Sequence, residues 1–268
     1  MAVTGLARSQ PSTQVLRSIA AASQQTGVSF GYLLNQASSE SGFNPSAKAP
    51  TSSASGLYQF TKATWLATVQ AHGADHGLGW ASSAIQRLPN GSYHVADKDA
   101  RQAILDLRND PTVAAQMAAE LAADNSAYVS GRLGRDVTPS DLALSHFLGA
   151  EGAVRFLTAL DDNPDASAAP LFPEAAAANR SVFYDASGAP RSLADIHAQF
   201  AAKANDTPGI PLSMNPPATL TSQRQTHLES HSASWPDRLP GIEPMPQHLS
   251  LQFAQDSYRR LAAMDDSQ

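Results

Sequence analysis

Up to about residue 203, apolar side chains recur every three or four positions, which is the spacing of an amphipathic helix. Alanine is abundant and runs of β-branched residues are scarce, so no strand is indicated as strongly as these helices. The expected helices start behind capping residues, and the first two end at a glycine. The predicted starts are Ser12, Ser29, Asp110, Thr138 and Ser192, and the predicted stops are Gly27 and Gly42. The pattern predicts a mainly α domain over residues 12–203.

The composition changes after that domain. Large apolar residues become few, and prolines crowd together at positions 208, 211, 216, 217, 236, 240, 244 and 246. Residues 204–268 are therefore expected to be a Pro-rich, disordered tail. Apolar spacing from Leu249 to Leu261 predicts a short terminal amphipathic helix, for which packing on its own domain is favoured over binding a partner.

Composition and charge exclude several classes of protein. The chain has 268 residues, 42% of them hydrophobic, which is enough to bury a core. It has no cysteine, so a disulfide framework, a zinc–thiolate site and a thiol nucleophile are excluded. Its net charge of −6 argues against sequence-independent nucleic-acid binding. We also expect no membrane span, and no signal peptide is visible at the N-terminus.

The candidate for acid–base chemistry is Glu40. It follows Ala37 by three residues and Leu33 by seven, so it lies at the edge of the buried face of the second helix, in its last turn. Partial burial and the helix C-terminus both favour the protonated form of a carboxyl, as a general acid needs. From Ser41 to Ala74 there is no Asp or Glu. A second carboxylate, if one is used, must therefore come from a distant position such as Asp97.

A second informative segment is Ser55-Gly56-Leu57-Tyr58-Gln59-Phe60. It is typical of a bend that glycine permits, followed by a helix that continues through Trp65. Gly56 would let the backbone approach a ligand closely, and Gln59 offers a donor and an acceptor to an amide or hydroxyl. This pairing suits a sugar amide better than a phosphate.

Together these segments resemble the soluble lytic transglycosylase (SLT) domains, lysozyme-like enzymes that cleave peptidoglycan. The family pattern is Glu-Ser at a helix end, aromatic-Asn-Pro, then Ser-Gly-Leu-x-Gln. It matches Glu40-Ser41, Phe43-Asn44-Pro45 and Ser55–Gln59 in order and spacing. More weakly, residues 145–149 stand where the family has Ala-Tyr-Asn-Ala-Gly, and residues 179–184 are similar to its late aromatic segment. The resemblance covers about residues 12–203.

The resemblance implies a lysozyme-like fold and cleavage between N-acetylmuramic acid and N-acetylglucosamine with 1,6-anhydro ends. Glu40 would act as acid and then as base, with no metal or cofactor. The implied substrate-binding residues are Ser41, Ser55, Gly56, Tyr58, Gln59, His146, Phe147 and Tyr184. The expected partners are peptidoglycan strands, with flagellar, secretion or phage components as candidates for the tail. The expected location is the periplasm or cell envelope.

Three departures from the family suggest a divergent branch. Phe147 is expected in place of the family's tyrosine, Leu148 in place of its asparagine, and Ala49 in place of a serine that binds the substrate's acetamido group. Two alternatives stay open: a non-catalytic glycan-binding or structural component of an envelope-spanning machine, and a hydrolytic muramidase. The candidates for the muramidase's second carboxylate are Asp75, Asp97, Asp99 and Asp106.

A zinc site is disfavoured. His72 and His76 are spaced four apart, as on zinc-binding helices. The neighbouring Gly73 and Gly77 weaken a helix there, and no third ligand is evident.

Overall fold

The structure is a computed structural model that describes residues 10–205. The predicted tail and its terminal helix, beyond residue 205, lie outside the described residues. The described part is mainly α, as expected. Its helices are α1 (Thr13–Thr26), α2 (Phe30–Ser41), α3 (Lys62–His72), η1 (Gly73–His76), α4 (Gly79–Ala84), α5 (Lys98–Asp106), η2 (Leu107–Asn109), α6 (Pro111–Leu133), α7 (Pro139–Asp162), α8 (Pro173–Ala178), α9 (Arg180–Phe183) and α10 (Leu193–Asn205).

The predicted helix signals act as caps. The Ser12 hydroxyl accepts from the backbone N–H of Val15 at 3.2 Å at the start of α1, and Gly27 ends that helix in the left-handed conformation. Thr138 and Asp141 form a reciprocal capping box at the start of α7. Such side chains satisfy backbone N–H groups that have no partner within the helix, which fixes where each helix begins.

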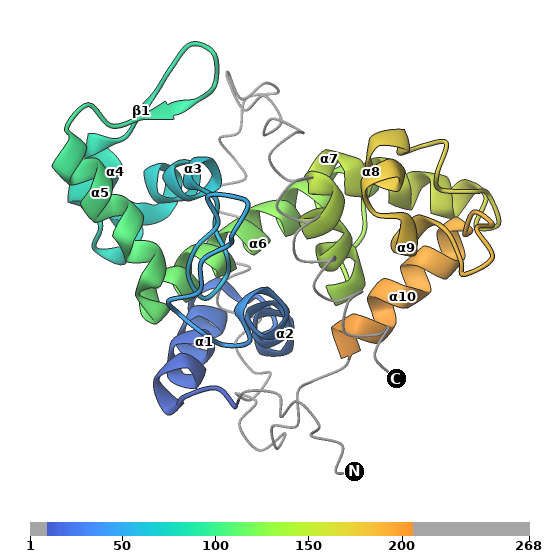
Figure 1. The fold of residues 1–268 in the computed structure, drawn as a ribbon, viewed down its shortest axis with the longest axis horizontal. Coiled ribbons are helices and arrows are strands. Elements are labelled where there is room, and N and C mark those ends of the chain that lie inside the picture. Colours follow the sequence, from blue (N-terminus) through green and yellow to red (C-terminus); the bar gives the residue numbers. More distant parts are fainter. Residues whose placement is uncertain (1–9, 206–268) are drawn as a thin grey trace.

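Two hydrophobic cores are joined by α6 (Figure 1). The first core lies among α1 to α5 and the first half of α6, and the second among α7 to α10 and the end of α6. Val137 and Ala143 pack against both cores. The largest fully buried residues are, in the first core, Ile19, Leu33, Leu34, Leu57, Trp65, Ile104, Leu105 and Met117, and in the second, Phe147, Phe156, Phe183 and Phe200. The Asn35 side chain of α2 donates to the carbonyl of Ala204 at 2.9 Å, so α10 also reaches back to the first half.

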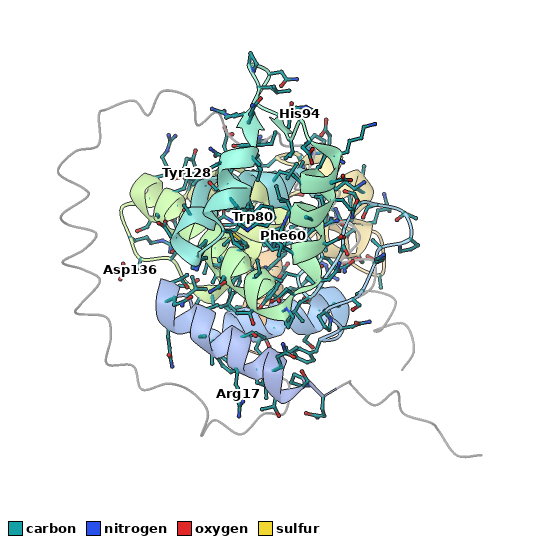
Figure 2. All side chains as sticks on the ribbon, turned by 90° about the vertical axis from the view of Figure 1, so that its left-hand side faces the viewer. Arg17, Phe60, Trp80, His94, Tyr128 and Asp136 are labelled. Atoms are coloured by element: carbon teal, nitrogen blue, oxygen red, sulfur yellow. The ribbon has the colours of Figure 1, made fainter. Side chains whose placement is uncertain are left out.

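A small hairpin stands at the outer edge of the first half. Strands β1 (Gln86–Arg87) and β2 (Tyr93–His94) pair antiparallel. Figure 2 shows His94 on this hairpin and, below it, Trp80 of α4, whose side chain is exposed. Across residues 10–205, every helix is too short or too polar to cross a bilayer.

Helix α7 is broken at Gly149, within the segment compared with Ala-Tyr-Asn-Ala-Gly. Gly149 has φ 76° and ψ 160°, a region that glycine alone adopts readily. The kink ends the first half of α7 immediately after Leu148. The direction of the second half of α7 therefore depends on a residue without a Cβ atom.

We expect Gly149→Ala to lower the free energy of unfolding by about 1–3 kcal/mol, because alanine strains this backbone conformation. Urea unfolding followed by circular dichroism measures the change. The matched control is Gly131→Ala in the interior of α6, where an added Cβ meets nothing within 4 Å and φ is not positive. This control should be neutral or stabilising. Equal effects of the two variants would contradict the role given to Gly149.

His72 and His76 contact carboxylates of α6 rather than each other. His72 Nε2 lies 2.7 Å from Asp124 Oδ2, and His76 Nε2 lies 2.9 Å from Glu120 Oε1. Within residues 10–205, no group of three or more potential ligands could hold a metal ion. These contacts link the end of α3 and η1 to α6.

The pKa of His72 is raised, first by the hydrogen bond to Asp124 and then, against a smaller opposing effect of burial, by the charges of Asp124, Glu120 and Asp75. A raised folded-state pKa adds stability that is complete below the unfolded pKa of about 6.5 and is lost as pH rises through the folded value. We therefore expect the stability difference between wild type and His72→Asn to shrink above neutral pH.

Urea titrations of both proteins across this pH range measure that difference. His94→Gln, which removes an exposed histidine of the hairpin, is the control and should leave the pH dependence in place. A difference that stays constant with pH would show that His72 contributes only packing.

Candidate active site

Glu40 occupies the last turn of α2 and is buried, with 3% of its surface exposed. The chain reverses directly after it. Gly42 and Phe43 both have positive φ, at 57° and 66°, and their N–H groups donate to the carbonyls of Ser38 and Ala37. This closure satisfies carbonyl groups at the helix end and keeps the last turn of α2 fixed around the Glu40 carboxyl.

The Glu40 carboxyl contacts a side chain from the other half of the molecule. His146 Nε2, on α7, lies 3.1 Å from Glu40 Oε1. Tyr32, which precedes Glu40 on α2, is also buried. Burial and then the negative charge of Glu40 raise the pKa of its phenol. Tyr32 therefore keeps its phenol protonated. The pair Glu40–His146 joins α2 to α7.

Ser41 and Ser55 connect the motif segments to their surroundings. The Ser41 hydroxyl donates to the carbonyls of Leu57 at 2.7 Å and Ala37 at 3.1 Å. The Ser55 hydroxyl donates to Asn109 Oδ1 at 3.0 Å. Both hydroxyls thus hold the 55–60 bend against α2 and η2. Their predicted contact with glycan stays a prediction.

Gly56 is needed for a close approach, but to the protein's own backbone. It has φ 87°, and a Cβ built on it would overlap the carbonyl oxygen of Arg108 and lie 2.7 Å from its carbonyl carbon. The sequence predicted a close approach to a ligand. In the structure η2 lies where a side chain of residue 56 would be, because the bend packs directly on that turn.

Arg108 was not expected from the sequence and organises this bend. It is buried, and its guanidinium donates to the carbonyls of Leu105, Ser53 and Phe60, the last two at 2.8 and 3.0 Å. Burial lowers the pKa of the guanidinium. Its one signal in the sequence is that it directly follows the apolar positions Ile104, Leu105 and Leu107.

Gln59 closes the bend from the inside. Its side-chain N–H₂ donates to the carbonyls of Gly56 at 2.9 Å and Ala47 at 3.1 Å, while its Oε1 is buried without a partner in the described residues. Gln59 has φ 47°. Within residues 10–205, Phe43 and Gln59 are the two non-glycine residues with positive φ. Backbone strain is therefore concentrated in the two motif segments beside Glu40.

Tyr58 and Phe147, predicted to bind substrate, lie in the two cores. Tyr58 is 3% exposed, and its hydroxyl donates to the carbonyl of Leu33 at 3.1 Å. Phe147 has no exposed surface and packs against Phe183 and Phe200. The structure gives both side chains packing roles, because neither presents surface to a ligand.

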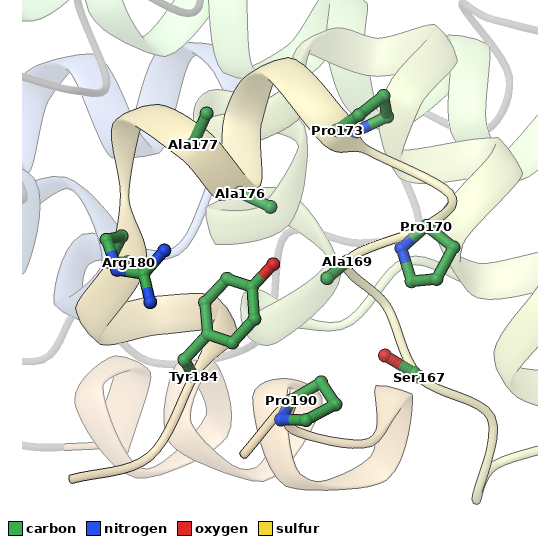
Figure 3. Close-up of a pocket in the computed structure, with 9 residues that line it drawn as sticks. All are labelled: Ser167, Ala169, Pro170, Pro173, Ala176, Ala177, Arg180, Tyr184 and Pro190. Atoms are coloured by element: carbon green, nitrogen blue, oxygen red, sulfur yellow. The ribbon is translucent and has the colours of Figure 1, made fainter. Parts of the chain in front are cut away.

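Tyr184 lines a separate hollow of about 410 Å³ (Figure 3). The guanidinium of Arg180 lies 4.7 Å from the centre of its ring, Pro190 pairs with Tyr184 in an antiparallel bridge, and Ser167 is among the other lining residues. Neither Glu40 nor His146 is among the lining residues. Contact of Tyr184 with substrate stays a prediction.

The two segments around Glu40 also carry a family signature. Residues 17–78 match the family described as transglycosylase SLT domain. This part of the chain is a transglycosylase SLT domain. The match spans α1, α2, the 55–60 bend and α3 with Glu40 at its centre, and it ends before α6 and α7. SLT domains are lysozyme-like, so the family supports a glycan-cleaving enzyme that acts on peptidoglycan.

The structure corrects one position in the comparison with the SLT family. The sequence placed Phe147 where the family has its tyrosine. In the structure Phe147 faces the second core, whereas its neighbour His146 reaches Glu40. Aligned residue by residue, Ser145–Gly149 also puts His146 at the tyrosine and Phe147 at the asparagine. Consecutive residues on a helix face different directions, so a shift of one residue exchanges a site residue for a core residue.

The four aspartates considered as a second catalytic carboxylate lie on the surface of the protein. Asp97 is the N-cap of α5 and accepts from the backbone N–H of Ala100 at 2.6 Å. Asp106 accepts from Gln102. Asp75, Asp97, Asp99 and Asp106 are all exposed. Glu40, by contrast, is the buried carboxyl of the SLT domain.

We expect Gly56→Ala to destabilise the protein by about 2–4 kcal/mol, because the added methyl combines a positive φ with overlap on the Arg108 backbone. Thermal unfolding measures the effect. Gly31→Ala in α2 is the matched control, since an added Cβ there lies 3.7 Å from its nearest neighbour, the Ser29 hydroxyl. Wild-type stability of Gly56→Ala would show that the bend is free to move away from η2.

Proposed function

We propose that this SLT domain is a murein lytic transglycosylase that cleaves the bond between N-acetylmuramic acid and N-acetylglucosamine and leaves 1,6-anhydromuramic ends. The observation that carries the proposal is the buried Glu40 carboxyl, which ends the family's motif helix and is held by His146 from the opposite half. A binding module without activity has no need for a buried acid, since burying a carboxyl disfavours folding unless it is compensated.

The reaction needs one carboxyl in two states. Protonated Glu40 gives its proton to the glycosidic oxygen, and the electron pair of the breaking C1–O bond goes to that oxygen. The muramic ring develops oxocarbenium character, which its own acetamido group stabilises. Ionised Glu40 then accepts the proton of the muramic 6-hydroxyl, whose oxygen bonds to C1. Glu40 is protonated again at the end, and no water is consumed.

The exposed positions of the other candidate carboxylates support this route over hydrolysis. A muramidase of the usual kind places a second carboxylate opposite the acid, and the two carboxyl groups lie about 5–9.5 Å apart. Asp97 is used as an exposed helix cap instead. Hydrolysis stays the second candidate, and the mass of the product separates the two.

Further parts of the proposal follow from the family's substrate. The backbone around Ser55–Gln59 and the side chain of Tyr184 are the groups we propose for glycan contact. His146, which the resemblance also implied for substrate binding, contacts Glu40. Peptidoglycan as substrate implies action in the cell envelope. Flagellar, secretion or phage components are the partners proposed for residues 206–268.

We expect Glu40→Gln to bind glycan and fold normally but to lose essentially all turnover, by at least about 10³-fold, because an amide neither donates nor accepts the proton. Wild type should release muropeptides that are lighter by one water than muramidase products. Mass spectrometry of material released from purified sacculi measures both.

The matched control is Glu151→Gln, which changes an exposed carboxylate of α7 and should keep wild-type activity. Reducing ends in place of anhydro ends would assign the protein to the muramidases. Undiminished activity of Glu40→Gln would refute the mechanism.

A further inference from the structure

The Glu40–His146 contact is asymmetric in burial. The Glu40 side chain is 4% exposed, and the His146 side chain is 19% exposed. The imidazole is the more exposed of the two groups, and its Nε2 lies 3.1 Å from one carboxyl oxygen, Oε1.

The backbone that presents His146 is fixed on both sides. The hydroxyl of the preceding Ser145 donates to the carbonyl of Asp141 at 2.9 Å, and the ring of the following Phe147 is wedged between Phe183 and Phe200 in the second core. Helix α7 is broken at Gly149, three residues after His146. Because its neighbours are locked by packing, the imidazole is held toward Glu40 before any substrate arrives.

We propose that His146 is a positioning residue whose Nε2–H donates to Glu40 Oε1 and so fixes the orientation of the carboxyl that gives its proton to the glycosidic oxygen. This inference rests on the proposed function. A hydrogen bond accepted at Oε1 holds the plane of the carboxyl in one orientation. His146 transfers no proton: Glu40 gives the proton and takes it back.

The same hydrogen bond also favours the reaction energetically. When Glu40 gives up its proton, its bond from Nε2–H becomes charge-assisted and about twice as strong as a neutral one. An interaction that strengthens toward the transition state raises kcat rather than lowering KM.

Two variants separate hydrogen-bond donation from packing. His146→Phe keeps a ring of similar size but has no donor. His146→Gln has an uncharged N–H₂ that can reach Oε1. We expect His146→Phe to lower kcat about 10- to 100-fold with KM within about twofold of wild type, and His146→Gln to stay within about fivefold of wild-type kcat. The substrate is a soluble peptidoglycan oligosaccharide, and thermal unfolding confirms that each variant is folded.

Each other outcome overturns the assignment. Wild-type kcat in His146→Phe would show that the donor is not used, and a kcat of His146→Gln as low as that of His146→Phe would show that donation is not sufficient. A raised KM with unchanged kcat would make His146 a glycan contact. If His146→Phe does not fold, His146→Leu gives the same comparison. A wild-type protein that makes reducing ends would refute the transglycosylase, while the kcat ratios would still test His146.

Discussion

The burial of one carboxyl group, that of Glu40, is the constraint on which the arrangement of this protein depends. A carboxyl with 3% exposure disfavours folding unless polar groups face it. His146 supplies such a group from α7, and α7 reaches that place because α6 runs through both hydrophobic cores. The site is therefore a product of the packing between the two halves, and neither half contains it alone.

The motif segments hold this carboxyl in place chiefly by binding each other. Ser41, Gln59 and Arg108 direct their donors to backbone carbonyls of the 47–60 region. Positive φ at Phe43 and Gln59 is tolerated because these bonds and the contact of Gly56 with η2 hold the surrounding backbone. A family signature that looks like a set of ligand-binding residues is, in large part, the framework of a rigid bend.

Much of the fold could be predicted from local signals, because caps and glycine stops act within one turn of a helix. Ser12, Gly27, Ser29, Gly42 and Thr138 all have the predicted role. Residues whose role depends on distant partners could not be assigned this way. Arg108 meets the 53–60 segment through tertiary packing, and the exchange of Phe147 for His146 is a matter of helix orientation that the second core decides. Glu40 was found because burial, helix position and motif coincide on one residue.

The bond between Glu40 and His146 joins residues 106 positions apart in the chain. During synthesis Glu40 therefore leaves the ribosome long before His146. The second core, which orients His146, is completed only near residue 200. A growing or truncated chain that ends before α7 contains the complete SLT signature and lacks the group that faces its acid. In such a protein, assembly of the active site is a late event of biosynthesis, and a damaged C-terminal half leaves a site without His146.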